Sequence, residues 1–127
     1  MTLKLLVSEF NEQCLLVQYL EINGFKFSKL AQETFTKSWK VKRDNTASGL
    51  RPGVPDMIVV IPANWRTAKK VKLLFIEMKR TKQSVTSEAQ KEWLFSLNLV
   101  DGVTTRVCKG YEEAKAFIEE EVKMLSI

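Results

Sequence analysis

Two short apolar runs, each bordered by charged residues, constrain the fold of this chain more than any other feature. The first is Met57–Ile61, which follows the turn-forming segment 52–55 and Asp56. The second is 73–76, which continues directly into the polar positions of 77–79. Both runs are short and rich in β-branched or aromatic residues. The sequence therefore predicts two buried strands joined by a hairpin connection.

The charged residues at the ends of these runs form one candidate site. Glu77 and Lys79 are two positions apart, so in a strand their side chains point to the same face, and a neighbouring strand can bring Asp56 beside them. Two carboxylates on a rigid sheet suit a hard cation such as Mg²⁺, and a lysine beside them can act on a water or a phosphate. The alternative is that Asp56 caps a turn while Glu77 pairs with Lys79 on a solvated face.

At these positions the chain resembles a known nuclease superfamily. Pro55-Asp56, followed about twenty residues later by Glu77-Met78-Lys79, resembles the PD-(D/E)XK pattern. Gly53 before this pair, and Ser87-Glu88-Ala89-Gln90 downstream, make the chain most similar to the VRR-NUC family (virus-type replication-repair nucleases). The matching motifs run from about Glu12 to Gln90.

This resemblance implies an α/β (α+β) fold with a restriction-endonuclease-like core, in which helices flank a mixed central β-sheet. All 127 residues are expected to form a single nuclease domain. The predicted elements, in chain order, are a helix over 8–23, a strand over 25–30, the two buried strands over about 56–61 and 71–80, a helix over 87–97, a strand over 103–108 and a helix over 111–124.

The resemblance also implies the chemistry, which is metal-dependent hydrolysis of a DNA phosphodiester. One or two Mg²⁺ or Mn²⁺ ions would be held by Glu12, Asp56, Glu77 and the backbone carbonyl of Met78. Lys79 would position or deprotonate the attacking water, or stabilise the transition state.

For two residues of this implied site, the sequence also allows a different interpretation. Gln90 would bind the water or the scissile phosphate, but with Ser87 three residues before it, it also fits a helix capping box. Glu12 has the spacing to Gly24 that the family's helix ligand has, whereas Glu9 lies nearby on the same helix. Both glutamates also suit the first turn of a helix, where they complement its dipole.

The positive charge gathers around the proposed carboxylates. Residues 26–51 hold seven basic and two acidic groups, 66–82 hold seven basic and one acidic, and 111–127 hold two basic and five acidic. Such a distribution is typical of a phosphate-binding surface, although a solvated lysine-rich face has the same composition. The predicted DNA-binding residues are Lys37, Lys40, Lys42, Arg43, Arg51, Arg80 and Lys82.

Around Trp39 an aromatic residue is interleaved with cations, which suits phosphate contacts and base stacking in a nucleic-acid groove. The alternative is a surface helix whose Trp39 packs on the core.

Composition excludes several classes of protein. There is no histidine, which excludes histidine-based zinc sites, histidine nucleases and Ser-His triads. No apolar run approaches the roughly 20 residues of a membrane span, and a signal-peptide pattern is not expected. Cys14 and Cys108 lack metal-ligand spacing and are predicted to be buried reduced thiols of a cytoplasmic protein in a bacterial or phage-infected host cell.

The sequence thus predicts a metal-dependent endodeoxyribonuclease of DNA replication, recombination or repair. The resemblance implies structure-selective cleavage like that of Holliday-junction resolvases, and the lack of a separate sequence-reading domain argues against a sequence-specific restriction enzyme. Symmetric cutting of a junction in turn favours a homodimer. The alternatives are a less selective or flap nuclease, and a DNA-binding module with the same fold but no turnover.

Overall fold

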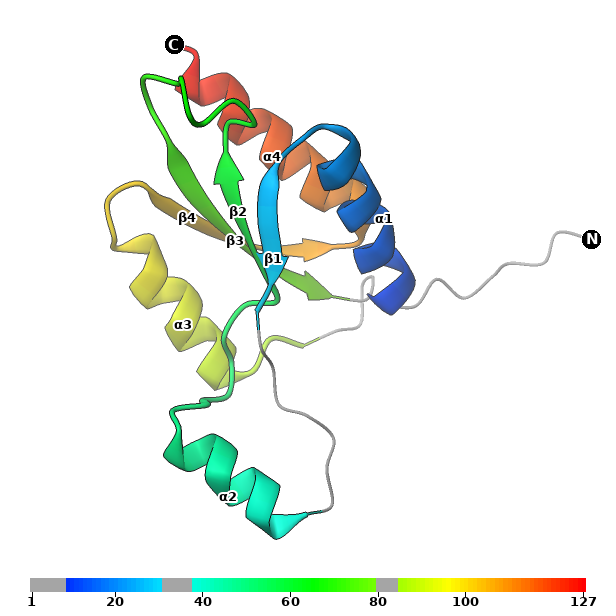
Figure 1. The fold of residues 1–127 in the computed structure, drawn as a ribbon, viewed down its shortest axis with the longest axis vertical. Coiled ribbons are helices and arrows are strands. Elements are labelled where there is room, and N and C mark those ends of the chain that lie inside the picture. The colour runs from blue at the N-terminus through cyan, green and yellow to red at the C-terminus, as the bar shows by residue number, and fades with distance from the viewer. Residues whose placement is uncertain (1–8, 31–37, 80–84) are drawn as a thin grey trace, which may run out of the picture.

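The computed structural model describes residues 9–30, 38–79 and 85–127. Its centre is a four-stranded mixed sheet in the order β1 to β4 (Figure 1). The first three strands are antiparallel neighbours, and the fourth runs parallel to the third. The strands are β1 (Lys26–Lys29), β2 (Met57–Ile61), β3 (Lys72–Lys79) and β4 (Val103–Lys109). The predicted hairpin between the two apolar runs is confirmed.

Helices cover both faces of this sheet. Between β3 and β4 the chain crosses over through α3, whereas α1 and α4 pack on each other and on the opposite face (Figure 1). The helices are α1 (Glu9–Ile22), α2 (Trp39–Ala47), α3 (Glu88–Asn98) and α4 (Tyr111–Leu125). The predicted fold class, a mixed sheet flanked by helices, is confirmed.

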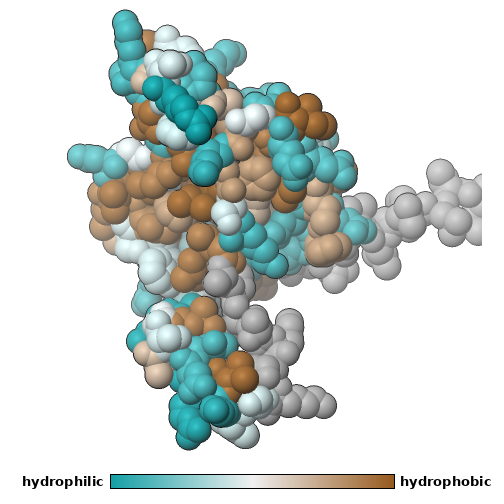
Figure 2. Space-filling view, in the orientation of Figure 1, coloured by the Kyte–Doolittle hydropathy of each residue, from teal (hydrophilic) through white to brown (hydrophobic). Residues whose placement is uncertain are grey.

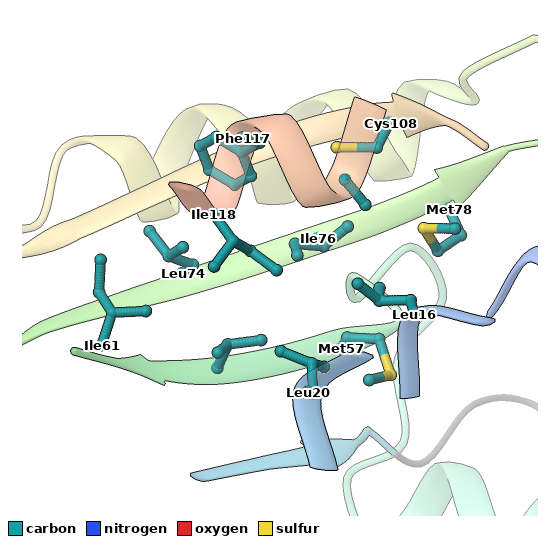
Figure 3. Close-up of a cluster of buried hydrophobic side chains, with 12 residues drawn as sticks. Leu16, Leu20, Met57, Ile61, Leu74, Ile76, Met78, Cys108, Phe117 and Ile118 are labelled. Atoms are coloured by element: carbon teal, nitrogen blue, oxygen red, sulfur yellow. The ribbon is translucent and has the colours of Figure 1, made fainter. Parts of the chain in front are cut away.

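The core lies between the sheet and the pair α1 and α4. Alternate residues of β2 and β3 point into it, because successive side chains of a strand face opposite sides. Figure 3 shows these side chains meeting Leu16 and Leu20 of α1 and Phe117 and Ile118 of α4. The fully buried strand residues are Met57, Val59 and Ile61 of β2, Leu74, Ile76 and Met78 of β3, and Cys108 of β4.

The two ends of α1 show how local sequence sets the bounds of the helix. Gly24 takes a positive φ of 74° directly after α1, and Phe25 N–H donates to the Leu20 carbonyl at 2.9 Å. This closing turn is the glycine-ended helix terminus that the sequence predicted. At the other end, Glu9 and Glu12 occupy the first turn, where negative charge complements the helix dipole.

Glu12 also caps a different helix. The residue at the N-cap of α4 is Gly110, which has no side chain to offer. The Glu12 carboxylate takes that place: its Oε2 accepts from Tyr111 N–H at 3.2 Å. A Cβ on Gly110 would lie 3.2 Å from Glu12 Oε1, so the glycine makes room for the carboxylate. Glu12 therefore joins α1 to the start of α4.

The basic segment before Pro55-Asp56 contains a helix, α2. The sequence had left two interpretations of this segment open, a nucleic-acid groove and a surface helix. Ser38 caps α2 by accepting from Val41 N–H. None of the residues of α2, all of which the structure describes, is buried, and Trp39 is 82% exposed. The interpretation in which Trp39 packs on the core is therefore wrong, because α2 projects away from the sheet (Figure 1).

The two cysteines are free thiols; Cys108 is buried and Cys14 half-buried. Burial raises the pKa of Cys108 to about 12, so this thiol is uncharged and unreactive at neutral pH. Among the helices of the described chain, none has the length and apolar character needed to cross a membrane.

We expect Glu12→Ala to destabilise the protein, because the first turn of α4 would lose its capping acceptor. The free energy of unfolding should fall by about 1 kcal/mol, whereas Glu12→Gln, which keeps an acceptor oxygen, should lose less. Urea denaturation of the two variants beside the wild type measures this difference. Equal stability of Glu12→Ala and wild type would contradict the capping role.

Candidate active site

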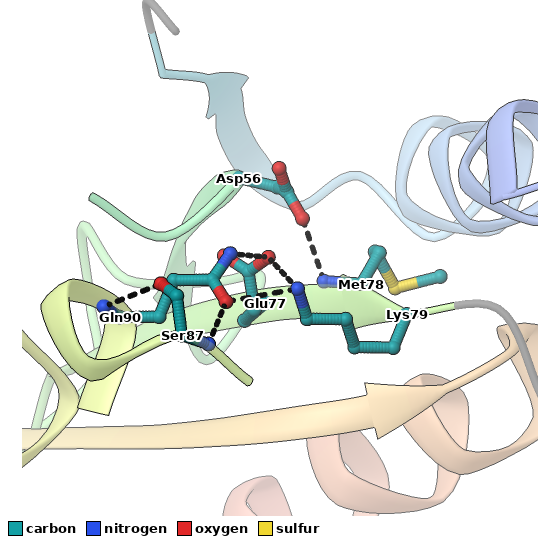
Figure 4. A network of polar contacts seen from close by, with 6 residues as sticks. All are labelled: Asp56, Glu77, Met78, Lys79, Ser87 and Gln90. Carbon is teal, nitrogen blue, oxygen red and sulfur yellow. Dashed lines mark hydrogen bonds and ion pairs between the residues drawn. The ribbon is translucent and has the colours of Figure 1, made fainter. Parts of the chain in front are cut away.

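Residues from β2, β3 and α3 meet on the α3 face of the sheet. The register that pairs Met57 with Ile76 puts Asp56 across from Glu77, one step beyond the last pair. Because strand side chains alternate, Glu77 and Lys79 point away from the core that holds Ile76 and Met78. Figure 4 shows Asp56, Glu77, Lys79 and Gln90 together. The meeting of Asp56, Glu77 and Lys79 follows from the strand parity predicted from the sequence, and α3 brings Gln90 to them.

Asp56 is fixed by the backbone of the neighbouring strand. Its Oδ2 accepts a 2.7 Å hydrogen bond from Met78 N–H, and its own carbonyl accepts from Leu30 N–H at 2.8 Å. Pro55 before it is buried. The Asp56 carboxylate thus accepts a hydrogen bond from the neighbouring strand, so it does more than cap a turn.

Glu77 and Lys79 form a buried ion pair with a third partner. Lys79 Nζ lies 3.4 Å from Glu77 Oε2, and their side chains are only 12% and 5% exposed. The same Nζ donates to Gln90 Oε1 at 2.9 Å. Gln90 Nε2 in turn donates to Glu77 Oε2 at 3.0 Å. A buried pair of charges needs such extra hydrogen bonds to be stable, and Gln90 supplies them to both members.

Gln90 is at the same time part of a helix cap, as the capping-box alternative predicted, whereas its binding of the water or the scissile phosphate stays a prediction. Ser87 Oγ accepts from Gln90 N–H at 3.2 Å, and Gln90 Oε1 accepts from Ser87 N–H at 2.9 Å. This capping box fixes the side-chain amide at the start of α3 (Figure 4). The cap therefore positions the amide that links Lys79 to Glu77.

The two carboxyl groups lie in a strongly perturbed electrostatic environment. Burial, and next the charge of Asp56, raise the pKa of Glu77 to about 7, against the opposing effect of Lys79. Burial also raises the pKa of Asp56, although Met78 N–H and the charges of Lys79 and Lys29 act against it. Perturbed carboxyl groups held side by side are typical of functional sites. A bound cation would relieve the repulsion between them.

Lys29 is a site residue that sequence reasoning missed. It lies at the end of β1, where it pairs with Met57, and its charge lowers the pKa of Asp56. The apolar-polar alternation over 25–30 predicted a half-buried strand but not the strand beside which it lies. Only the sheet order β1-β2-β3 brings this charge near Asp56.

Gly53, in the loop that leads to Asp56, packs against the first turn of α3. A Cβ on this residue would lie 2.6 Å from the carbonyl carbon of Ala89 and 2.8 Å from Gln90 N. Its φ of +92° is also a conformation that other residues rarely adopt. The loop that carries Asp56 thus packs directly on the turn that carries Gln90, and only glycine permits the approach.

Glu12 is not brought to this cluster, since its carboxylate contacts the start of α4 on the other side of the sheet. In the described ranges no group of three or more His, Cys, Asp or Glu residues could hold a metal ion. The third-carboxylate role of Glu12, and that of Glu9, therefore stay predictions. So does the Met78 carbonyl ligand, although the Met78 N–H is held by Asp56.

The predicted DNA-binding residues fall into three groups. Lys40, Lys42 and Arg43 are exposed on α2. Arg51 is exposed too, but its Nη1 donates to the carbonyls of Thr46 and Leu50 and so fixes the end of α2. The remaining predicted residues, Lys37, Arg80 and Lys82, lie outside the described residues.

Comparison with known proteins agrees with this geometry. The VRR-NUC domain family matches residues 6–112. The chain belongs to this family. A solved structure described as a VRR_NUC domain protein is similar to it with a TM-score of 0.69 and 21% identity, over 91% of this chain and 88% of that one. No curated protein matches the chain. The resemblance inferred from Pro55-Asp56 and Glu77-Met78-Lys79 is thereby confirmed, and VRR-NUC is a nuclease-type family.

The raised pKa of Glu77 predicts that the stability of this VRR-NUC domain depends on pH. With a pKa of about 7 when folded and an ordinary value of 4.5, Glu77 holds its proton more tightly in the folded state. The stabilisation is therefore fully present below about pH 4.5 and is lost as pH rises through 7, by on the order of 3 kcal/mol. Urea denaturation of metal-free protein between pH 5 and 8 measures the loss.

Two controls separate this effect from general charge repulsion. Glu77→Gln, which cannot ionise, should flatten most of the pH dependence. Added Mg²⁺ or Mn²⁺ should restore stability at pH 8 and have little effect at pH 5, because a protonated carboxyl is a poor ligand. An equal slope in Glu77→Gln and wild type would disprove the assignment to Glu77.

Gly53→Ala should impair the site by pushing the loop away from α3. We expect a loss of stability of about 1–3 kcal/mol from overpacking and from the positive φ. Gly49→Ala is the matched control, because Gly49 has a φ of +110° but nothing within 4 Å of an added Cβ. Any function of the site should fall further in Gly53→Ala than in Gly49→Ala at temperatures where both are folded. Equal behaviour of the two variants would show that the contact with Ala89 is not needed.

Proposed function

We propose that this VRR-NUC protein is an endodeoxyribonuclease that depends on Mg²⁺ or Mn²⁺. The observation that carries the proposal is the cluster of Asp56, Glu77, Lys79 and Gln90, held by hydrogen bonds and an ion pair on one face of the sheet. Belonging to a nuclease-type family supports it. A pure DNA-binding module would have no use for two crowded carboxylates beside a buried lysine.

The donor set fits a hard divalent cation. Mg²⁺ is commonly held by one or two carboxylates together with substrate phosphates and waters, and Asp56 and Glu77 supply such a pair. The Met78 carbonyl is proposed as a further ligand, and Glu12 would join only if it left Tyr111. When bound, one or two such ions would lower the pKa of a coordinated water and neutralise charge on the phosphate.

The protein groups have separate tasks in the proposed reaction. Lys79 presents its ammonium beside Glu77, where it orients the attacking water or stabilises the negative charge that develops on the phosphate. Gln90 holds that ammonium with its amide oxygen and holds Glu77 with its amide nitrogen. Low exposure strengthens each of these electrostatic contacts, because little water competes for them.

Exposed cations supply the affinity for DNA in this proposal. Lys40, Lys42 and Arg43 on α2 belong to a basic segment of the chain, and Arg51 lies between α2 and Asp56. Together with Lys37, Arg80 and Lys82 they would neutralise backbone phosphates of the bound DNA. Such contacts do not depend on base sequence, which agrees with selection of branched or junction DNA by its shape in replication, recombination or repair.

Substitution at the carboxylates and the lysine tests the proposal. Asp56→Asn, Glu77→Gln and Lys79→Met should each lower cleavage of plasmid or junction DNA in Mg²⁺ or Mn²⁺ by about 10²- to 10⁴-fold. Binding to labelled DNA in EDTA should change little, because these groups act on the reaction more than on affinity. Gel assays of cleavage and fluorescence anisotropy of binding give the two readouts.

Glu88→Gln is the matched control for this series. Glu88 is in the first turn of α3, its side chain is 88% exposed and its partner is the surface residue Lys91. The Glu88→Gln variant should cleave DNA as fast as the wild type. Wild-type protein that binds DNA but never cuts it, with either metal, would leave the non-catalytic binding module as the function.

We also propose a homodimer, which would give the two cuts that a four-way junction needs. Exposed apolar side chains on and after α3 support it, since Phe95, Leu99 and Val100 are 69%, 71% and 52% exposed. Figure 2 shows the apolar area over α3 and the adjoining sheet.

Light scattering at micromolar concentration should give about twice the 14.6 kDa chain mass. The double variant Phe95→Lys with Leu99→Lys should have half the mass of the wild type by light scattering, that of one chain. A wild-type monomer that nicks flaps and duplexes equally well would contradict both the dimer and the junction preference while leaving the nuclease proposal intact.

A further inference from the structure

α2 contributes nothing to the core yet keeps a defined helical shape. None of its nine residues, all described, is buried, and in Figure 2 it forms a separate lobe below the body of the protein. Its internal contacts are local: the Ser38 cap and the hydrogen bond from Thr46 to the Lys42 carbonyl. A nine-residue helix with no buried residue is marginal in water on its own. A partner that packs on α2 would stabilise the helix further.

One face of α2 has the chemistry of a nucleic-acid ligand site. Trp39, Lys42 and Arg43 stand at positions i, i+3 and i+4, so their side chains share a face of the helix. Lys42 Nζ lies 5.4 Å from the centre of the Trp39 ring. The acidic residue of α2, Asp44, lies off this face. An exposed indole flanked by an ammonium and a guanidinium complements a base and its phosphates.

The indole favours an unpaired base over a base pair. In a duplex the faces of the bases are covered by their neighbours, and a protein reaches only groove edges and phosphates. A single-stranded base offers its whole face, and stacking on an aromatic side chain binds it whatever its identity.

The path of the chain links this face to the carboxylates. Arg51 Nη1 donates to Thr46 O at 2.9 Å and to Leu50 O at 3.0 Å, which fixes the end of α2 on the loop that continues to Asp56. Residues 48–55 make up that loop. Eight residues span at most about 28 Å, and α2 adds about 13 Å because Trp39 is its first residue, so the Trp39 backbone lies at most roughly 40 Å from Asp56.

We infer that α2 is a recognition arm that binds an unpaired nucleotide of the DNA that is cut, with Trp39 stacked on its base and Lys42 and Arg43 on its phosphates. The inference rests on the proposed function and deepens it, because it names DNA with a single-stranded arm as the substrate class. The arm then selects branched DNA by the presence of an exposed base.

The test compares three labelled DNAs in EDTA, where no cleavage occurs: a blunt duplex, the same duplex with one unpaired arm, and the single strand. Trp39→Ala should weaken binding to the forked and single-stranded DNA by about 5- to 150-fold and to the blunt duplex by less than about 2-fold. Trp39→Phe should retain most of the affinity. Val41→Ala, on the same helix, is the control and should bind like wild type.

Salt dependence separates stacking from charge. Trp39→Ala should leave the slope of log K against log salt unchanged, whereas Lys42→Gln with Arg43→Gln should reduce it by up to about 2 on every DNA. Circular dichroism should give the same melting temperature for Trp39→Ala as for wild type, because this side chain is exposed.

Three results would overturn the inference. Trp39→Ala could lose equal affinity for all three DNAs, or none. Alternatively, it could halve the mass found by light scattering, which would make α2 a contact between two copies. A wild-type protein that binds none of the DNAs would instead refute the proposed function, so the two failures are distinguishable.

Discussion

The register between β2 and β3 is the constraint on which the site depends. Side chains of a strand alternate between faces, so a slip of β3 by one residue would turn Glu77 and Lys79 into the core and away from Asp56. It would at the same time expose Ile76 and Met78, which are now fully buried. Burying those two side chains is worth about 1.5–3 kcal/mol each, and burying unpaired charges costs several more. The hydrophobic core therefore fixes the orientation of the polar cluster.

Within that register the polar groups satisfy one another. Glu77 and Lys79 are nearly inaccessible, and the ion pair alone would not offset the loss of their hydration. Gln90 contributes hydrogen bonds to both, and its own position is set by the cap at Ser87. Helix capping, ordinarily a matter of local stability, here orients two charged side chains on a neighbouring strand.

The sequence predicts those features that depend on local pattern. Short apolar runs rich in β-branched and aromatic residues predicted β2 and β3, Gly24 predicted the end of α1, and the spacing of Ser87 and Gln90 predicted the cap. The same reasoning could not find features that arise from distant contacts. Glu12 caps α4, Lys29 acts on Asp56, and Gly53 packs on Ala89, each across a separation that no periodicity records.

The charges of the molecule suit a polyanionic substrate in a specific way. Asp56 and Glu77 would repel a phosphate, and burial raises the pKa of both, with the charge of Asp56 adding to the rise at Glu77. Cations at different distances offset this repulsion: Lys79 within the cluster, Lys29 at its edge, and Lys42 and Arg43 on α2. Exposed cations at the periphery are screened by salt but attract the strand over about 10 Å, whereas the buried lysine acts only at contact. In the proposed reaction, attraction and chemistry would thus fall to different residues.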